Sequence, residues 1–443
     1  MTMRRLAPFV HEDSRKHHTR GRALATAVLL IAACAIPIRA SADEVLDWNA
    51  VAVRAIRIGA VPGPVQSRAL ATVHTAMFDA LNGIERRFTS IHVPAGAPRG
   101  ASQRAAVVQA AYTALVGLFP AQIADFDGDL EASLAAIAAD AAIENSESIA
   151  RGRLWGEEVA MAVLLWRSLD GLNPPGQAYV GNTGVGQWRP TPPGFLPMLV
   201  PNMAVMAPFV IESPTDFQPA GPPPLASEEY AAAVAEVEAV GALVSATRSE
   251  DQTESARFWA GTAASFWNRA GVMASQQRHL TLSENARLFA LLNIAQADAL
   301  IAAWDSKVLF NFWRPITAIR LASTDGNPQT IEDPTWAPLI TEPPYPEYTS
   351  GHQSVSGTSQ AVLTAYFGAE PVEGFSEALP GVVRRWPNFA AAADEALLAR
   401  IWSGIHFRFT MVETRVIAEQ VAAYVVENAA QPLNGKRTGQ APD

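Results

Sequence analysis

Alanine-rich segments with apolar residues three and four positions apart are the feature that most limits how this 443-residue chain can fold. This spacing places apolar side chains on one face of a helix, so each segment is predicted to be a helix that packs against others. The segment from Thr281 begins with a capping box, because Glu284 follows three residues later. The pattern predicts an all-α fold. The segments are Val51 to Ile84, broken at Pro62 and Pro64, and Ser102 to Phe119, Ser146 to Leu169, Ser227 to Val244, Thr281 to Trp313, Ser354 to Phe367 and Thr410 to Asn428.

A proline-rich stretch without helical spacing divides these segments into two groups. Between Pro174 and Pro224 lie 13 of the 32 prolines. A loop of this length in a compact protein is usually functional, so we expect it to wrap the surface or to cover a site. The predicted organisation is a signal peptide at 1–42, an N-terminal helical bundle at 43–173, a connecting loop at 174–226, a C-terminal bundle at 227–430 and a polar tail at 431–443.

The first 42 residues have the pattern of an export signal. Residues 1–22 contain six basic side chains, the last of which is Arg22. The apolar run Ala23 to Ile38 follows, and Ala40-Ser41-Ala42 matches a signal-peptidase site. The run has 16 residues, fewer than the roughly 20 that span a bilayer, so no stable membrane span is expected. We therefore predict a periplasmic or secreted protein. Because Ile31 to Cys34 resembles a lipobox, lipoprotein anchoring at Cys34 stays open.

Charge and cysteine content exclude several classes of function. Cleavage after Ala42 removes seven basic and two acidic residues and leaves a net charge of −15, which argues against a nucleic-acid partner. The single cysteine, Cys34, permits no intramolecular disulfide and argues against a cysteine-based metal site. Only 17% of residues are charged, and this abundance of apolar helix surface suggests a homodimer.

Three short segments combine cationic side chains with histidine. Lys307 is the only lysine outside the two ends of the chain, and Arg314 lies seven residues later, on the same face if one helix runs through both. Ser350-Gly351-His352 precedes a predicted helix, whose free backbone amides favour an anion. Arg400 precedes His406 by six. Each segment alone fits a structural role, as a solvated helix face, a helix cap or a core histidine. Together they suit a tetrahedral oxyanion.

The three segments resemble, in order, the signature of the type 2 phosphatidic-acid phosphatase superfamily: Lys-x6-Arg-Pro, Pro-Ser-Gly-His and Arg-x5-His-x3-Asp. Their surroundings, Phe312 to Arg320, Pro343 to Tyr348 and Gly404 to Phe409, are similar to those in one branch, the vanadium-dependent haloperoxidases. The resemblance covers roughly residues 45 to 428. It implies two four-helix bundles with the active site in the C-terminal one.

The resemblance also implies a cofactor and a role for each matching residue. One vanadate per chain would be bound through His406, with its oxygens held by Lys307, Arg314, Ser350, Gly351 and Arg400. His352 would transfer protons as hydrogen peroxide displaces an oxygen, and Lys307 would polarise the peroxide. A halide would then attack the peroxide bound to vanadate, and hypohalous acid would leave.

The chain departs from the signature at two positions. Thr410 stands where the third motif has Asp, so the residue that orients His406 is not evident. Thr349 replaces Pro, which we expect to matter little. Tyr345 occupies a position that the family associates with halide preference, but a tyrosine there does not identify the halide. Asp298 and Asp305 are candidates to orient Arg400 or Lys307, whereas His74 is predicted to be a core residue.

Two other functions fit the same residues. An exported acid-phosphatase-like phosphomonoesterase would take a phosphate ester, with His406 forming a phosphohistidine and His352 protonating the leaving oxygen. A non-catalytic helical protein, either structural or oxyanion-binding, is the third reading and is motivated by Thr410.

Overall fold

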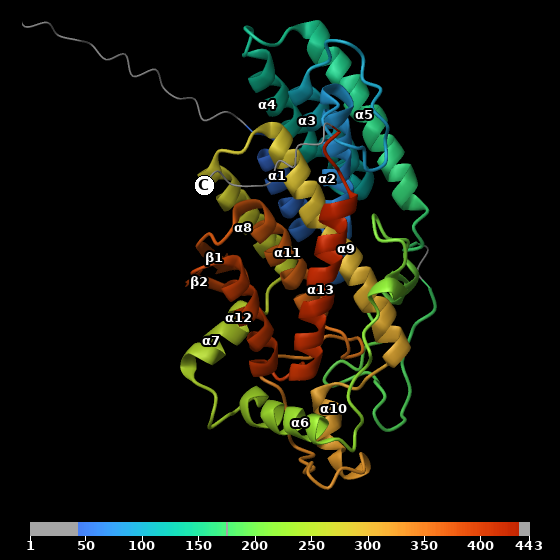
Figure 1. The fold of residues 1–443 in the computed structure, drawn as a ribbon, viewed down its shortest axis with the longest axis vertical. Coiled ribbons are helices and arrows are strands. Elements are labelled where there is room, and N and C mark those ends of the chain that lie inside the picture. The colour runs from blue at the N-terminus through green and yellow to red at the C-terminus, as the bar shows by residue number, and fades with distance from the viewer. Residues whose placement is uncertain (1–42, 174–175, 434–443) are drawn as a thin grey trace, which may run out of the picture. The chain divides into compact units, whose positions relative to one another are not determined.

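The structure is a computed structural model that describes residues 43–173 and 176–433, and it confirms the all-α prediction (Figure 1). The predicted signal peptide, including Cys34, and nearly all of the polar tail lie outside these residues. The helices are α1 (Glu44–Ile58), α2 (Gly63–Glu85), α3 (Gln103–Leu118), α4 (Ile123–Ala138), α5 (Ser146–Ser168), α6 (Glu228–Gly241), α7 (Glu250–Phe258), α8 (Ala263–Arg278), α9 (Leu282–Phe310), α10 (Pro315–Arg320), α11 (Gly351–Phe367), α12 (Phe389–Trp402) and α13 (Arg408–Asn428).

In the N-terminal bundle helices α1 to α5 pack against one another, and α3 and α5 meet where small residues face each other. A Cβ atom on Gly156 of α5 would lie 2.3 Å from the carbonyl oxygen of Ala106, and one on Gly152 would lie 2.4 Å from that of Ser102. Alanines on α3 complete this interface and are fully buried. The glycines therefore let two backbones meet at a distance that no side chain would permit.

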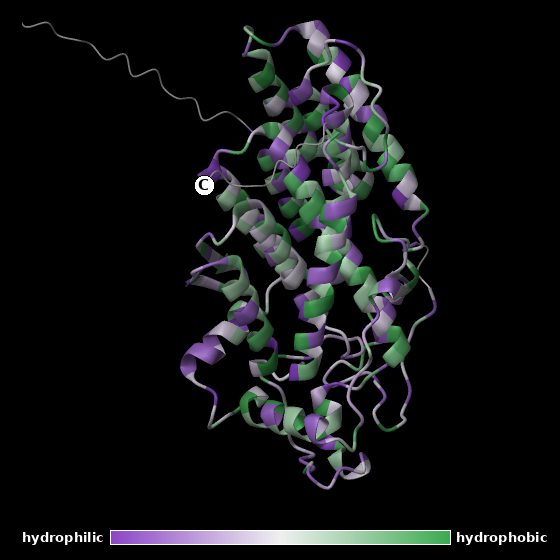
Figure 2. Ribbon diagram, viewed as in Figure 1, coloured by the Kyte–Doolittle hydropathy of each residue, from purple (hydrophilic) through white to green (hydrophobic). Residues whose placement is uncertain are grey.

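Helix α9 joins the two halves of the chain. It packs against α1 and α2 of the N-terminal bundle and against α8, α11 and α13 of the C-terminal one, so one continuous hydrophobic core contains residues from both. It is the one described helix that is long and apolar enough by itself to cross a membrane, but 94% of the relevant window is buried, as in a core helix. Hydrophobic and hydrophilic residues are interspersed along most helices (Figure 2).

Helix α9 is shorter than predicted, and this corrects the expected placement of two site residues. It begins with the predicted capping box at Thr281 but ends at Phe310, because Asn311 adopts a left-handed conformation with φ of 43°. Arg314 therefore lies beyond the turn, as the N-cap of α10. Lys307 and Arg314 do not share a helix face. They lie within electrostatic range of each other because the chain turns at Asn311 between them.

Several elements carried no clear periodic signal and were not predicted. Helices α4, α7, α8 and α12 are absent from the prediction. So is a hairpin between α11 and α12, formed by β1 (Val372–Ser376) and β2 (Leu379–Trp386), which pair antiparallel with Val372 opposite Trp386. Glu395 of α12 anchors this region by accepting hydrogen bonds from the indoles of Trp259 and Trp386 and from Arg384. Such long-range anchoring leaves no local pattern in the sequence.

The proline-rich loop lies against the segments that carry the predicted site. Its amides and carbonyls bond to those segments at Asn311, Trp313 and Pro344, and its short 3₁₀ helices at Pro201–Val205 and Pro214–Phe217 contact α9. Asp298 of α9 accepts hydrogen bonds from the amides of residues 209 to 211 of the loop at 2.7 to 3.0 Å. Asp298 therefore fastens the loop and does not orient Arg400 or Lys307 as expected.

The close contact between α3 and α5 gives a direct test. Gly156→Ala should lower the free energy of unfolding by about 1–3 kcal/mol, because the new methyl group meets a backbone carbonyl that can move only with its helix. The matched control is Gly128→Ala in α4, where a Cβ meets nothing within 4 Å and helix propensity predicts a gain of up to ~1 kcal/mol. Urea unfolding midpoints measure both, and shifts of the same sign would contradict the packing described.

Candidate functional site

Five separate elements contribute the residues of the three sequence motifs. Lys307 lies in the last turn of α9, Arg314 at the start of α10, Ser350 at the start of α11, Arg400 in the last turn of α12, and His406 in the turn before α13. All five side chains are at least nine-tenths buried. Lys307, Arg314, Arg400 and His352 all lie within electrostatic range of His406. The structure thus brings the predicted residues together.

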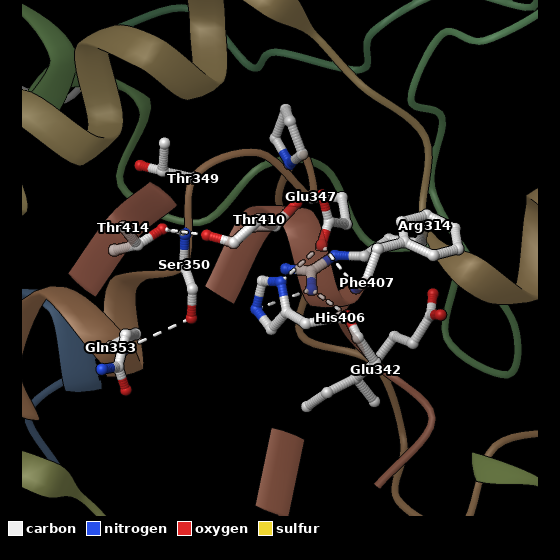
Figure 3. A network of polar contacts seen from close by, with 12 residues as sticks. Arg314, Glu342, Glu347, Thr349, Ser350, Gln353, His406, Phe407, Thr410 and Thr414 are labelled. Carbon is white, nitrogen blue, oxygen red and sulfur yellow. Dashed lines mark hydrogen bonds and ion pairs between the residues drawn. The ribbon is translucent and has the colours of Figure 1, made fainter. Parts of the chain in front are cut away.

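His406 is held from both sides of its ring (Figure 3). Nδ1 lies 2.8 Å from Oε1 of Glu347, and Nε2 lies 3.2 Å from Nη1 of Arg314. The turn before it depends on Gly404, which has a φ of 80° and packs against the carbonyl of Gly241, 2.4 Å from where a Cβ would be. The imidazole is therefore fixed in place before any ligand binds.

Glu347 is itself buried and fully hydrogen-bonded. Oε1 also accepts from the amide of Phe407 at 3.0 Å, and Oε2 accepts from the hydroxyl of Thr410 at 2.7 Å. Its backbone amide donates to the carbonyl of Phe312 at 2.9 Å. Burial raises the pKa of this carboxyl group to about 7, against the lowering effect of the Thr410 hydrogen bond and of Arg314. Glu347 was not among the predicted site residues, although it lies five residues before His352.

Lys307 contacts the backbone of the same loop. Its ammonium donates to the carbonyl oxygens of Pro346 at 2.7 Å, of Glu347 at 3.1 Å and of Thr349. Burial and the neighbouring Arg314 lower the pKa of Lys307, whereas Glu347 raises it. Three acceptors nevertheless require three N–H donors, which only the charged ammonium has. Lys307 therefore fastens the loop. Its ammonium can donate to a bound oxyanion only if it gives up the hydrogen bond to one of these carbonyls.

The start of α11 presents free backbone donors, as predicted. Ser350 is the N-cap, and its hydroxyl accepts from the amide of Gln353. Among the described residues no acceptor bonds the amides of Gly351 and His352, because the first turn of a helix has no intrahelical partner for them. A side chain at position 351 would clash with Trp304, whose ring lies 2.9 Å from the position of a Cβ. Glycine therefore lets α11 approach α9 at this point.

Several buried polar atoms around His406 have no hydrogen-bond partner in the part of the chain that the structure describes. They are Nη2 of Arg314, Nε of Arg400, Nε2 of His352 and both amide atoms of Gln353. Leaving buried donors without partners is costly, so these groups are placed to bind a polar ligand. Two guanidinium groups, a hydroxyl and two free amides match the oxygens of a tetrahedral oxyanion. The residues present fit vanadate or phosphate.

Burial and neighbouring positive charge determine the protonation state of the two site histidines. Burial lowers the pKa of His406 well below its usual value, and Arg314 and Lys307 lower it further. Burial, with Arg400, does the same for His352, whose ring packs edge-on against Trp259. Both imidazoles are therefore neutral at pH 7. A neutral His406 has one free lone pair, which a histidine needs in order to bind a metal or attack phosphorus.

Other predictions have mixed outcomes. His74 is fully buried against Phe289 and hydrogen-bonded to Asn49, which confirms a core role. Asp305 contacts Gln218 rather than a site residue, so that expectation is wrong. Among the described residues no cluster of three or more His, Cys, Asp or Glu side chains could hold a metal cation. The site is built from cationic donors around one histidine.

The ring of Tyr345 borders the cationic cluster. Nζ of Lys307 lies 4.9 Å from its centroid, the guanidinium carbon of Arg314 lies 5.0 Å from it, and Trp304 packs beside it. Tyr345 also lies within electrostatic range of Arg400. It is partly exposed, unlike the cations beneath it. The side of the site bounded by Tyr345 and His352 is therefore nearest to solvent.

Comparison with known proteins agrees with this geometry. Residues 287–435 match the family model of the VCPO second helical-bundle domain. The chain is 28% identical to the vanadium chloroperoxidase of Curvularia inaequalis, an alignment that covers 85% of this chain and 80% of that protein. Its fold is similar to that of a bacterial vanadium-dependent iodoperoxidase, with a TM-score of 0.74, 25% identity, and 87% and 96% of the two chains covered.

A bacterial vanadium-dependent chloroperoxidase in its holo form shares the fold at a TM-score of 0.64 and 18% identity, over 83% of this chain and 93% of that one. The matched domain carries every one of the motif residues described above, from Lys307 to His406. Sequence, fold and site thus point to one family. The chain is similar, in sequence and in fold, to vanadium-dependent haloperoxidases.

Proposed function

We propose that this protein is a vanadate-dependent haloperoxidase that uses hydrogen peroxide to oxidise a halide to hypohalous acid. The observation that carries the proposal is the neutral His406, with Nδ1 held by Glu347 and Nε2 facing cationic donors. Bound vanadate would supply a Lewis acid that activates peroxide without changing its own oxidation state. His406 would be its protein ligand, through Nε2.

The surrounding residues would hold the oxygens of that group. Nη2 of Arg314 and Nε of Arg400 are free donors, and the amides of Gly351 and His352 add neutral ones at the positive end of α11. Nη1 of Arg314 now donates to Nε2 of His406, so ligand binding exchanges that contact for one to the ligand. Burial of the cluster strengthens each of these interactions, because water does not screen them.

His352 would move protons rather than hold the ligand. Its Nε2 is buried without a partner among the described residues, and its neutral imidazole can accept a proton at pH 7. It lies in the first turn of α11, two residues after Ser350, and its ring packs edge-on against Trp259. We infer that it takes a proton from incoming hydrogen peroxide at Nε2 and returns it to the oxygen that leaves.

The central test compares halide oxidation with phosphate-ester hydrolysis. Purified protein loaded with orthovanadate should oxidise at least one of iodide, bromide and chloride in the presence of hydrogen peroxide. His406→Ala should abolish orthovanadate binding, measured by calorimetry, whereas His352→Ala should keep binding within about threefold and slow turnover by ~100-fold or more. The control is His92→Ala, which removes a histidine stacked on Trp166 outside the site.

Two results would contradict the proposal. If orthovanadate only inhibits and phosphate esters are hydrolysed, the protein is the phosphomonoesterase considered above. If neither orthovanadate nor phosphate binds, or if His406→Ala leaves binding unchanged, the non-catalytic alternative holds.

Lys307 gives a second prediction. Lys307→Arg should lower the free energy of unfolding by about 2–4 kcal/mol and weaken orthovanadate binding at least tenfold, because a planar guanidinium cannot donate to three carbonyls that converge on one point. Thermal unfolding and calorimetry measure the two effects. The matched control is Arg57→Lys, an exchange on the exposed end of α1. Normal stability and affinity in Lys307→Arg would remove Lys307 from the site.

We further propose that the protein is exported and periplasmic or secreted. The support is the pattern of residues 1–42, and the predicted cleavage leaves Asp43 in place as the side-chain cap of α1. N-terminal sequencing of the mature protein tests cleavage after Ala42 against lipid attachment at Cys34. A homodimer is a separate proposal, supported by exposed apolar side chains on one face of α5, Leu154, Met161 and Leu165, and light scattering tests it.

A further inference from the structure

Glu347 contacts the residue that would bind the cofactor, yet it belongs to none of the three motifs. It is fully buried, its Oε1 lies 2.8 Å from Nδ1 of His406, and its Oε2 accepts from Thr410 at 2.7 Å (Figure 3). Position 410 is where the third motif carries Asp. We propose that Glu347 is the positioning residue for His406, replacing from the loop before α11 the carboxylate that the signature places on α13.

The two hydrogen bonds of His406 determine which nitrogen carries the proton. Arg314 has donors and no acceptor, so Nε2 of His406 must accept from Nη1. A neutral imidazole then carries its proton on Nδ1 and donates it to Glu347. The lone pair that can bind a ligand is left on Nε2, facing the cations. Glu347 thus fixes both the tautomer and the direction of the ring.

Thr410 and Glu347 fit each other as a pair. The hydroxyl of Thr410 donates to the carboxylate, and Thr410 is fully buried. An aspartate at position 410 would place a second carboxylate against Glu347 at a fully buried position, which is unfavourable. A hydroxyl at 410 therefore goes together with a carboxylate at 347. The absence of Asp from the third motif is then no sign of a decayed site.

The backbone of Glu347 is held firmly enough for such a role. Its amide donates to Phe312, its carbonyl accepts from Lys307, and Lys307 also bonds the carbonyls of Pro346 and Thr349. The amide of Phe407, the residue after His406, donates to the same carboxylate oxygen as Nδ1. The loop and the turn before α13 are therefore joined directly at this side chain.

The test moves the carboxylate from one position to the other. Three variants are compared with wild type: Glu347→Gln, which keeps the shape and an acceptor; Glu347→Ala, which removes the partner; and Glu347→Ala with Thr410→Asp, which restores a carboxylate at 410. Nitrogen-15 NMR of His406 in protein without vanadate reports the tautomer. Calorimetry measures the affinity for two anions. Orthovanadate reports binding that includes a bond from Nε2 of His406, and inorganic phosphate reports binding by the hydrogen-bond donors alone.

The proposal predicts a selective loss. Glu347→Gln should keep the Nδ1–H tautomer but weaken orthovanadate binding 10–100-fold, and phosphate binding by less than threefold, because only the bond from Nε2 depends on the basicity of the ring. Glu347→Ala should give mixed tautomers. The double variant should recover the Nδ1–H tautomer and bring orthovanadate affinity to within about tenfold of wild type. If Glu347→Ala does not fold, the other two variants carry the test.

Asp79→Asn is the matched control, since Asp79 is a buried carboxyl group that accepts from three backbone amides in the N-terminal bundle. It should lower the thermal midpoint and leave the tautomer and the ratio of the two affinities unchanged. Equal loss of both anions in Glu347→Gln, unchanged orthovanadate affinity, or no recovery in the double variant would overturn the role of Glu347.

What binds at Nε2 rests on the proposed function, but the two can fail separately. If the protein oxidises no halide but Glu347→Gln shows the selective loss of orthovanadate affinity, Glu347 remains the positioning residue and the haloperoxidase assignment is wrong. If the protein oxidises halide but Glu347→Gln leaves the ratio of the two affinities unchanged, the haloperoxidase assignment holds and the role proposed for Glu347 is wrong.

Discussion

The contact between the ammonium of Lys307 and three carbonyl oxygens of one loop supports the rest of the site. Those carbonyls belong to Pro346, Glu347 and Thr349, so one charge fixes the backbone on both sides of the residue that holds His406 and directly before Ser350. A compact ammonium suits three convergent acceptors, whereas a guanidinium does not. This gives a physical reason for a single lysine in the middle of a chain that otherwise uses arginine.

The same burial that makes this contact strong makes the site require a ligand. Lys307 and Arg314 are fully inaccessible and Arg400 nearly so, within a protein of net negative charge. Burial lowers the pKa values of Lys307, Arg400 and both site histidines, and repulsion from the neighbouring cations lowers them further. Glu347 offsets part of that repulsion, and an oxyanion would offset the remainder. The donors around His406 that have no partner among the described residues are the groups that would bind it.

Local signals predicted the helices well where periodicity and caps agreed. The capping box at Thr281 and the cap at Ser350 are where the sequence indicated, and α3, α5 and α13 lie within a few residues of their predicted bounds. The predicted end of α9 at Trp313 was wrong, because the apolar pattern continues past the left-handed turn at Asn311. Helices α7 and α12 were missed because they support each other across the sequence: Ser255 of α7 and Trp259 at its end donate to Glu395 of α12.

The sequence alone determined the all-helical class, because caps and periodicity are local properties, and its resemblance to a known family singled out the cationic residues and His406 as the predicted site. It could not show that Glu347 replaces the carboxylate expected at position 410, since the two positions are 63 residues apart in the chain and meet only when the loop and α13 pack. Nor could it show that Lys307 faces backbone carbonyls. Both depend on which atoms the fold brings within hydrogen-bond distance, and only the tertiary structure decides that.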